Sequence, residues 1–476
     1  MAGSVRSGVA PEELRTFWLM GAKSRILDGF LVDAIHELTP PGGTFLDLCC
    51  GTGIVGRSVA PRQRVLANDT QRYSEIVARA QLEGGAKWRR ALLDSDTVDP
   101  VADLETAYRA NWRRLRSLLP GVLTIEDRLL SDIQEGRGGK KARADYRRFC
   151  EQTPEPPTPE LPSKGSKSKA RVAPAFEKLA RGAAEWIADR RRNPRKAPFL
   201  LMTSYYANVY FGVRQAMELD SYRAAIAALP ADDPFRRQKR TLYLAALVHA
   251  ASVSTSGTSH FAQPRSIRKD GELARVAQRR GLSIREQFER AVDAIRAEWS
   301  EVPRNARNRV YREDGVELLR RKARRGEGVD LVYLDPPYTS DNYSRFYHVL
   351  ETLVAYDYPP LQLRGGALTI GRYPEADGRF HSDFCRRGEV EGAFRAVAAG
   401  AQALGANLLV SYSEENGLLL RGWRSGGERD PVARFRRLFR DHFRHVEVRD
   451  TWLMHSGQGD SNPEVRELLV LCRGAK

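Results

Sequence analysis

The stretch FLDLCCGTGIVG at residues 45–56 combines a short apolar run around Asp47 with two glycines and a following apolar segment. This order of residues is typical of a buried strand, a tight turn and a helix. Gly51 and Gly53 allow the backbone to turn sharply and to approach a ligand where a β-carbon would collide with it. Asp47, at the end of the strand, can face the bound molecule. The stretch therefore predicts the first strand, turn and helix of a ligand-binding α/β fold.

A second strand, expected at residues 64–67, is followed by Asn68 and Asp69. Asp69 lies 22 residues after Asp47, close to the offset of roughly 20 residues at which an acidic side chain meets ribose hydroxyls in nucleotide-binding folds. We therefore predict a ligand that contains adenosine. Gly56 completes a Gly-x-Gly-x-x-Gly spacing, so a nicotinamide dinucleotide stays open as an alternative ligand on this segment alone.

Strand-like and helix-like segments alternate from residue 16 to 81 and again from residue 308 to the end, which is typical of a sheet with crossover helices. Further parallel strands are expected at residues 331–334 and 407–411. Residues 446–452 and 467–472 are expected to form a closing antiparallel pair. We predict a mixed, mainly parallel, seven-stranded α/β sheet of Rossmann-like type with flanking helices.

Residues 83–305 are expected to form a large, mostly helical insert. Apolar residues recur at helical spacing over residues 104–119 and 283–299, and Ser283 with Glu286 forms a capping box at the start of the second segment. Within the insert, residues 151–172 are rich in proline, serine and lysine without an apolar period, and we predict a flexible linker there. The chain is thus divided into a cofactor-binding part (1–82), the insert (83–305) and a catalytic part (306–476).

The chain has 476 residues, and its 77 lysines and arginines against 60 acidic residues give a formal charge of +17. Such a charge favours a polyphosphate partner, although a soluble protein with many arginines explains it equally well. Five cysteines without a Cys-x-x-Cys pair indicate no disulfide framework and no structural zinc, so we expect a reducing compartment and no metal. Without a signal pattern or an apolar run of about 20 residues, the chain is expected to be cytoplasmic, with no membrane contact.

The run VYLDPPY at residues 332–338 is a second chemical signature, a buried strand that ends at two prolines. Prolines fix their own φ angles and remove backbone donors, so nearby carbonyls are left unpaired. The carboxylate of Asp335 and the carbonyl of Pro336 can accept hydrogen bonds from a nucleobase amino group and turn its lone pair toward a methyl donor. Tyr338 offers a flat face for an extruded base. The alternative interpretation is an ordinary strand followed by a proline turn.

Lys23 lies within the segment MGAKS (residues 20–24), just before an expected amphipathic helix. Free backbone donors at a helix start attract a carboxylate, and the methionine part of S-adenosylmethionine carries one. Structural capping explains the segment equally well.

Residues 21–25, 45–56, 68–69 and 333–358 together resemble the Dam-like adenine-specific DNA methyltransferases, amino-methyltransferases with an Asp-Pro-Pro-Tyr signature that occur in restriction-modification systems. The resemblance implies S-adenosylmethionine as the cofactor, held by the glycine turn, with Asp69 at its ribose and Lys23 near its carboxylate. Asp314 resembles the family's acidic contact to the cofactor adenine. The residues implied to hold the target base are Asp335, Pro336, Pro337 and Tyr338.

The implied reaction is methyl transfer to adenine N6 in double-stranded DNA after the base has left the stack. Cytosine N4 presents a similar amino group and stays open as a target. Methylation of RNA or of a protein amide, and an inactive binding protein with the same fold, also stay open. The resemblance is compatible with a cognate restriction endonuclease as a partner.

The insert resembles the family's target-recognition domain, and its basic runs are the expected contacts to phosphate. Each run has an alternative interpretation as a solvated surface. A polar loop at residues 252–263 and the segment after the catalytic turn add further candidates. The predicted nucleic-acid contacts are Arg236, Arg237, Lys239, Arg240, His260, Arg265, Arg268, Tyr343 and Arg345.

Overall fold

The computed structural model describes residues 27–94, 98–154, 174–180, 188, 192–193, 199–258, 260–301, 304–341, 343–454 and 464–476. Lys23 and most of the expected linker at 151–172 lie outside these ranges. Of the helices in the described part of the chain, none is long and apolar enough to cross a membrane.

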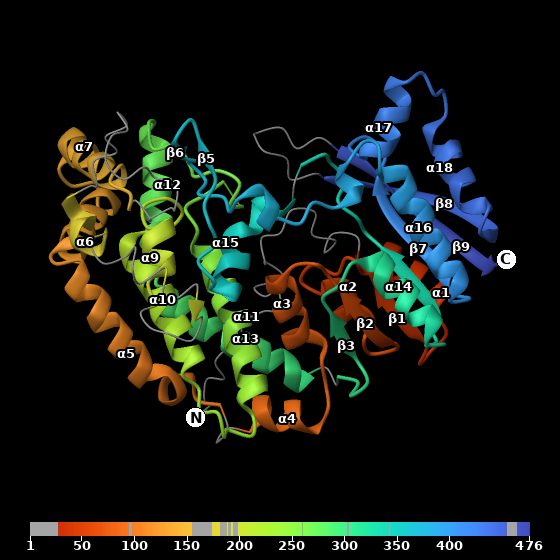
Figure 1. Ribbon diagram of the computed structural model, residues 1–476, viewed down its shortest axis with the longest axis horizontal. Helices are drawn as coiled ribbons and strands as arrows, with labels where there is room; N and C mark the ends of the chain where they lie inside the picture. Colours follow the sequence, from red (N-terminus) through yellow and green to blue (C-terminus); the bar gives the residue numbers. More distant parts are fainter. Residues whose placement is uncertain are drawn as a thin grey trace, which may run out of the picture.

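The main sheet contains seven strands among the described residues, in the order β3-β2-β1-β4-β7-β9-β8 (Figure 1). Neighbours run parallel from β3 to β7, whereas β9 is antiparallel to both β7 and β8. The expected mixed, mainly parallel α/β sheet and its closing antiparallel pair are confirmed. The strands are β1 (Thr44–Asp47), β2 (Arg64–Asn68), β3 (Arg309–Tyr311), β4 (Leu331–Leu334), β7 (Asn407–Ser413), β8 (Phe443–Met454) and β9 (Glu464–Ala475).

The strand order reverses between β1 and β4. From β1 the chain continues outward to β2 on one side, whereas β4 continues to β7 on the other. In open parallel sheets, such a reversal leaves a crevice at the carboxyl ends of the two central strands. Asp47 is the last residue of β1 and pairs with Tyr333 of β4, and Asp335 directly follows β4. Both residues therefore lie at the crevice that the topology creates.

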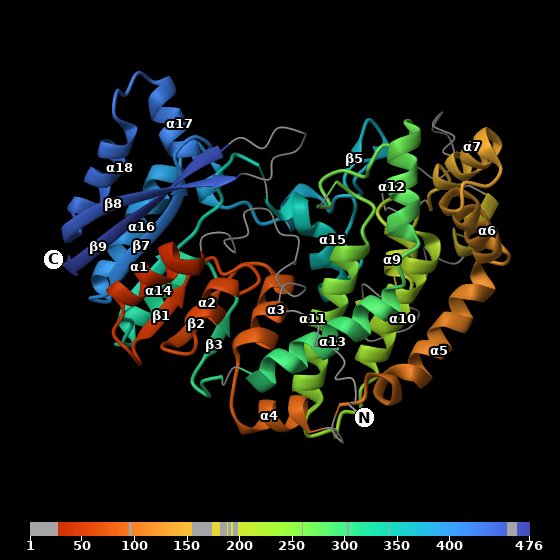
Figure 2. The ribbon, with the colours of Figure 1, turned by 180° about the vertical axis from the view of Figure 1, so that it is seen from behind.

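Helices cover both faces of the sheet (Figures 1 and 2). The helices on one face share an apolar core with Phe45, Val65 and Leu331, and those on the other share a core with Leu46, Val332 and Val410. The first face carries η2 (Leu27–Leu31), α1 (Val32–Leu38), α2 (Ile54–Val59) and α3 (Arg72–Leu82). The second carries α14 (Gly315–Arg324), α16 (Val390–Ala403), α17 (Leu418–Ser425) and α18 (Pro431–Arg440), with η5 (Asp383–Cys385) beside α16.

A second group of helices, here called the helical lobe, lies beside the sheet and has its own large apolar core (Figure 1). Residues 243–253 form the C-terminal part of α11, and most of them are buried. The lobe contains α4 (Ala86–Leu93), α5 (Pro100–Leu118), α6 (Val122–Gln134), α7 (Gly139–Cys150), η3 (Pro174–Phe176), α9 (Leu201–Tyr206), α10 (Val213–Ala227), α11 (Arg236–Ser254), α12 (Asp270–Arg280) and α13 (Ile284–Glu301).

Local sequence signals account for the ends of the two helices expected in this lobe. Asp99 caps α5 by accepting hydrogen bonds from the backbone nitrogens of Val101 and Ala102 at 2.9 and 3.0 Å. Ser283 Oγ accepts from the backbone nitrogen of Glu286 at 3.2 Å at the start of α13. Both helices are confirmed, with ends within a few residues of the expected ones.

The helical lobe also includes α15 (Tyr343–Ala355), which follows the Asp-Pro-Pro-Tyr run in the sequence. Leu350 and Leu353 of α15 are buried in the lobe core rather than against the sheet. After α15 the chain forms a short hairpin, β5 (Leu363–Arg364) with β6 (Ala367–Leu368), and then η4 (Ala376–Gly378). The segment that leaves β4 therefore connects the sheet to the helical lobe.

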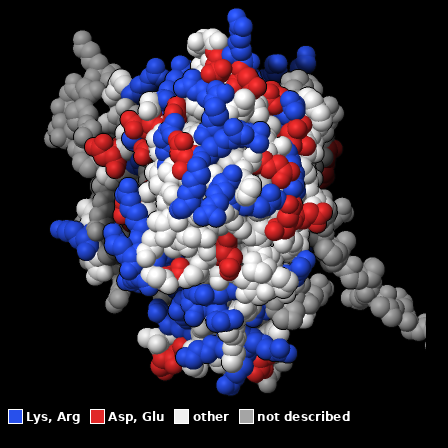
Figure 3. Space-filling view, turned by 90° about the vertical axis from the view of Figure 1, so that its right-hand side faces the viewer, with Lys and Arg blue, Asp and Glu red and all other residues white. Residues whose placement is uncertain are grey.

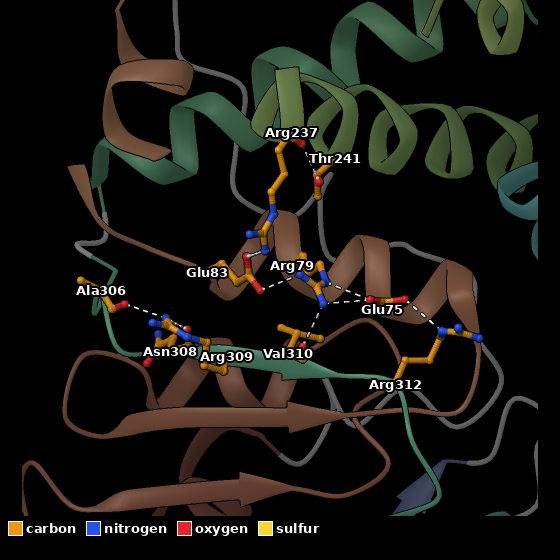
Figure 4. A network of polar contacts seen from close by, with 10 residues as sticks. All are labelled: Glu75, Arg79, Glu83, Arg237, Thr241, Ala306, Asn308, Arg309, Val310 and Arg312. Atoms are coloured by element: carbon orange, nitrogen blue, oxygen red, sulfur yellow. Dashed lines mark hydrogen bonds and ion pairs between the residues drawn. The ribbon is translucent and has the colours of Figure 1, made fainter. Parts of the chain in front are cut away.

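Helix α3 forms a second connection, through a network of polar contacts (Figure 4). Arg79 contacts Glu75 at 2.9 Å, Glu83 at 3.1 Å and the carbonyl of Val310 in β3 at 3.2 Å. Glu83 also pairs with Arg237 of α11 at 3.2 Å. Thus one helix is bonded to the edge of the sheet and to the helical lobe.

Candidate active site

A cavity of about 220 Å³ opens at the carboxyl ends of β1, β2 and β4. Side chains from the sheet edge line one side, and Tyr343, Ser344 and Tyr347 of α15 line the other. The structure brings together in this cavity most of the residues predicted for cofactor and base: Asp47, Gly51, Asp69, Asp314, Asp335, Pro336, Pro337, Tyr338 and Tyr343.

The turn after β1 has the backbone that its glycines allow. Gly51 and Gly53 have φ angles of 52° and 81°, which L side chains rarely adopt. A β-carbon on Gly53 would lie 3.3 Å from Ala78 of α3. Gly53 is not among the residues that line the cavity. Gly53 therefore allows the turn to pack closely against α3, whereas Gly51 forms part of the cavity wall.

Asp69 holds this turn against the turn after β2. Its two carboxylate oxygens accept hydrogen bonds from the backbone nitrogens of Gly51 and Gln71, at 3.0 and 2.9 Å. A carboxylate offers about four acceptor sites, so these two bonds leave sites for hydroxyl donors. Burial raises the pKa of Asp69 to about 6, and the backbone donors oppose this shift.

Asp314 reaches the cavity because β3 lies next to β2, despite the long separation in sequence. Its Oδ1 accepts from the backbone nitrogens of Val316 and Glu317, at 3.0 and 3.1 Å, and so caps α14. Asn68 holds the neighbouring backbone in place through bonds of 3.1 Å to Leu48 and Glu313. A capping role is visible for Asp314, and the cofactor contact stays a prediction.

At the other end of the cavity, Tyr338 lies between two carboxylates. Its hydroxyl oxygen is 2.9 Å from Asp335 Oδ1 and 2.6 Å from Oε1 of Glu467 in β9. Ser411 of β7 also donates to Glu467 Oε1. Glu467 is only 1% exposed, so its charge is held inside the protein by hydroxyl donors. Burial raises the pKa of Tyr338, followed by the charges of Asp335 and Glu467.

The carboxylates in the cavity influence one another. Burial raises the pKa of Asp47 well above its ordinary value, and the charges of Asp335 and Asp69 raise it further. The backbone nitrogen of Cys49, 3.3 Å from Asp47 Oδ1, opposes this shift. Arg57 also lines the cavity, but Glu298 pairs with it at 2.9 Å. Burial and mutual repulsion of the clustered carboxyl groups therefore favour the neutral form of Asp47 in this cavity.

Aromatic rings from α15, from the chain after η4 and from α3 line the cavity. Tyr343 and Tyr347 come from α15, and Phe380 and Phe384 come from the chain after η4. Tyr347 also packs against Tyr73 of α3, with ring centroids 5.4 Å apart. Phe380 is 47% exposed, which is unusual for its type and leaves a flat apolar face at the mouth of the cavity.

Two of the predicted nucleic-acid contacts lie inside the protein. Lys239 is buried and pairs with Asp103 and Asp233 at 3.0 and 3.1 Å. His260 is also buried, and its Nδ1 accepts from the backbone nitrogen of Ala262 at 3.0 Å. The geometry therefore favours a structural role for Lys239 and His260.

The other basic candidates lie at the surface in different settings. Arg236 donates to the carbonyl of Leu229 at 3.0 Å, Arg237 pairs with Glu83, and Arg265 pairs with Glu272 at 2.7 Å. Arg240 and Arg268 are exposed. Basic side chains are also dense on the side of the molecule where α18 and the C-terminus lie (Figure 3). Positive charge alone therefore does not identify a binding face.

Several residues at the site were not expected from the sequence. Glu467, Phe380 and Phe384 are contributed by segments more than 40 residues after the catalytic motif. The signal for Glu467 is an acidic residue directly before an apolar strand segment, LLVLC at 468–472. Nothing in the local pattern distinguishes Phe380 from a core aromatic residue.

Comparisons with known proteins relate parts of the chain to other sequences. A family model described as "Conserved hypothetical protein 95" matches residues 273–356, which include Asp314 and the Asp-Pro-Pro-Tyr run. Over 113 residues the chain is 36% identical to the type II methyltransferase M.FokI of Planomicrobium okeanokoites, which covers 24% of this chain. Over 185 residues it is 24% identical to the modification methylase LlaI of Lactococcus lactis subsp. lactis, which covers 37% of this chain. The matched stretches span only 15% and 26% of the length of these two relatives.

Proposed function

We propose that this protein is a DNA methyltransferase of restriction-modification type that transfers the methyl group of S-adenosylmethionine to adenine N6 after base flipping. The observation that carries the proposal is one cavity that joins the glycine turn and Asp69 to Asp335 and Tyr338, at the strand reversal between β1 and β4. The residues proposed to bind the cofactor and those proposed to bind the base thus line the same crevice.

The charge of the cavity supports this cofactor over a dinucleotide. Asp47, Asp69 and Asp335 line the cavity, and its basic residue Arg57 is already paired with Glu298. A positively charged sulfonium would favour the ionised form of these carboxyl groups, whereas a pyrophosphate would meet a basic residue that is already paired. The remaining acceptor sites of Asp69 suit the two ribose hydroxyls. When bound, the cofactor supplies the electrophilic methyl group.

The other half of the cavity suits a nucleobase with an amino group. The carboxylate of Asp335 and the carbonyl of Pro336 can accept its two N–H groups, which directs the nitrogen lone pair along the cavity. Tyr338, Tyr343 and Phe380 offer aromatic faces for the extruded base. The protein's main contribution is to orient the amine, because the lone pair must point at the methyl carbon.

The partial similarity to proteins named as a type II methyltransferase and a modification methylase supports DNA as the substrate. An adenine target rests on the resemblance of the Asp-Pro-Pro-Tyr motif. The proposed substrate is duplex DNA, and a cognate restriction endonuclease is a candidate partner.

The test incubates the purified protein with tritiated S-adenosylmethionine and, separately, with duplex DNA, RNA and protein. We expect label in DNA, and N6-methyladenine after digestion to nucleosides and mass spectrometry. N4-methylcytosine would correct the target base but keep the reaction. Label in RNA or protein alone, or in none of the three, would overturn the proposal. Long-read sequencing of DNA from a methylation-free host that expresses the protein identifies the recognition sequence.

A further inference from the structure

We propose that Arg345 and Arg379 together bind one backbone phosphate of a nucleic acid at the lip of the cavity. This phosphate clamp rests on the proposed function, since it assumes a nucleic-acid substrate. Arg345 was a candidate contact from the sequence, whereas Arg379 and Tyr373, the ring that both arginines contact, were identified only from the structure.

The two guanidinium groups share one aromatic platform. The Cζ atoms of Arg345 and Arg379 lie 4.6 and 6.0 Å from the ring centroid of Tyr373. They come from segments 34 residues apart, because Arg345 is in the first turn of α15 and Arg379 directly follows η4. The hairpin β5–β6 and the turn after it bring the two segments together.

Neither arginine has an ion-pair partner among the described carboxylates. Arg379 donates at 3.4 Å to the amide oxygen of Gln362, while its Nε and Nη1 are shielded from solvent without a hydrogen bond. Burial and the neighbouring charge of Arg345 lower the pKa of Arg379. Two cations that contact the same ring and repel each other are stabilised by an anion that both can reach.

The platform is rigid, so the two groups are held in place before a ligand arrives. Tyr373 is 7% exposed, and its hydroxyl donates to the carbonyl of Ala262. The ring of His348 lies 5.1 Å from the Tyr373 ring. Burial lowers the pKa of His348 to about 4, so this neighbour adds no positive charge at neutral pH. The excess charge belongs to the two arginines.

Both arginines are next in the chain to residues that line the cavity. Ser344 and Phe380, the chain neighbours of Arg345 and Arg379, both line the cavity. Paired guanidinium groups match a phosphodiester, whose two non-bridging oxygens can each accept from one planar fork. Phosphate contacts of this kind fix the position of a nucleic acid without reading its sequence.

Two exposed arginines on the helices that cover the sheet differ from the pair at the clamp. Arg395 of α16 pairs with Glu391 at 3.0 Å and lies 3.4 Å from Asp441. Arg320 of α14 pairs with Glu317 at 2.5 Å. These side chains already have carboxylate partners, so a phosphate would have to displace them. Arg395 is therefore the matched control for a substitution at the clamp.

The experiment measures binding of a fluorescent 30-base-pair duplex by anisotropy between 50 and 200 mM salt, with the full chain and without cofactor. We expect Arg345→Gln and Arg379→Gln each to weaken binding about fivefold to tenfold at 100 mM salt. In the double variant, the slope of log affinity against log salt should become shallower by about 0.9, which corresponds to the loss of one phosphate contact. Arg395→Gln should leave the affinity and slope unchanged.

The outcomes separate the clamp from the proposed function. Thermal unfolding and affinity for S-adenosylhomocysteine should match the wild type in all variants, since neither arginine contacts the cofactor half. A double variant with wild-type affinity and slope would overturn the clamp and leave the methyltransferase proposal intact. A wild-type protein that binds no duplex but binds single-stranded RNA would overturn DNA as the substrate, and the same variants measured on RNA would then decide the clamp.

Discussion

The hydroxyl oxygen of Tyr338 lies 2.6 Å from Oε1 of Glu467, so strand β9 is bonded to the tyrosine that follows β4. Asp335 Oδ1 is 2.9 Å from the same hydroxyl. We expect Tyr338→Phe to keep the ring for stacking but to lower kcat about tenfold or more, because a hydrogen bond to a charged group contributes about 1.5–3 kcal/mol.

The measurement is steady-state methyl transfer together with the Kd of S-adenosylhomocysteine, which should stay within about twofold of the wild-type value. Tyr412→Phe is the control. Tyr412 packs edge-on against Tyr338 at 5.5 Å, but its hydroxyl accepts from the backbone of Leu419. Equal losses of kcat in the two variants would show that packing, not the contact with Glu467, explains the effect.

Replacement of Asp335 tests the chemical end of the cavity. Asp335→Ala removes the carboxylate that would accept from the target amine, so we expect methyl transfer to fall below detection while cofactor binding stays nearly unchanged. Calorimetry with S-adenosylhomocysteine measures cofactor binding, and a tritium-transfer assay measures methyl transfer. Asp441→Ala, which removes an exposed carboxylate at the end of α18, should remain fully active. An active Asp335→Ala enzyme would mean that the base is oriented elsewhere.

Cofactor affinity should depend on pH through Asp69. Burial raises the pKa of Asp69 to about 6, and ribose hydroxyls donate to its ionised form. Affinity should therefore be complete above about pH 7 and fall as the pH drops through about 6, with a Kd about tenfold higher at pH 5 than at pH 7.5. Equilibrium dialysis with S-adenosylhomocysteine measures this. Asp69→Asn should bind weakly with a flat profile, and an unchanged slope in that variant would assign the titration to another group.

The helical lobe depends on a buried carboxylate for its stability. Asp220 is 0% exposed and accepts from the backbone nitrogens of Met202 and Thr203, both at 2.8 Å, as well as from the hydroxyl of Tyr356. Asp220→Ala leaves these donors without partners and should lower the free energy of unfolding by about 3 kcal/mol.

Urea denaturation followed by circular dichroism measures the loss. Asp127→Ala removes a carboxylate whose side chain is 50% exposed and paired with Arg214, and it should cost less than about 1 kcal/mol. Similar losses at the two positions would mean that burial of Asp220 does not determine its contribution.

Strands with strong apolar character and nearby glycine or proline could be predicted from the sequence, which is why β1, β2, β4, β7 and the β8–β9 pair were expected near their observed positions. β3 was missed because Arg309–Tyr311 is only three residues long and becomes a strand through pairing with β2. The β5–β6 hairpin was also missed, although Gly365 and Gly366 are a recognised turn signal.

For the site, the residues at strand ends could be predicted because parallel strands bring their carboxyl ends to one edge of the sheet. That α15 packs in the core of the helical lobe could not be predicted, because the apolar spacing of a helix does not show which core it packs against. Lys239 and His260 could not be recognised as buried from the sequence, because a basic residue in sequence gives no sign of a partner inside the protein, such as Asp103 for Lys239.

Helix α3 begins directly after the turn that holds Asp69, and its first backbone nitrogens, those of Arg72 and Tyr73, donate to Glu351 of α15 at 2.8 and 3.2 Å. Its other end is bonded to Arg237 through Glu83. A rotation of the helical lobe would therefore displace the turn that carries Asp69, the proposed ribose contact. Free-energy coupling between two ligands is reciprocal, so we expect DNA and cofactor to alter each other's affinity by the same factor, and to bind as a cooperative pair rather than independently.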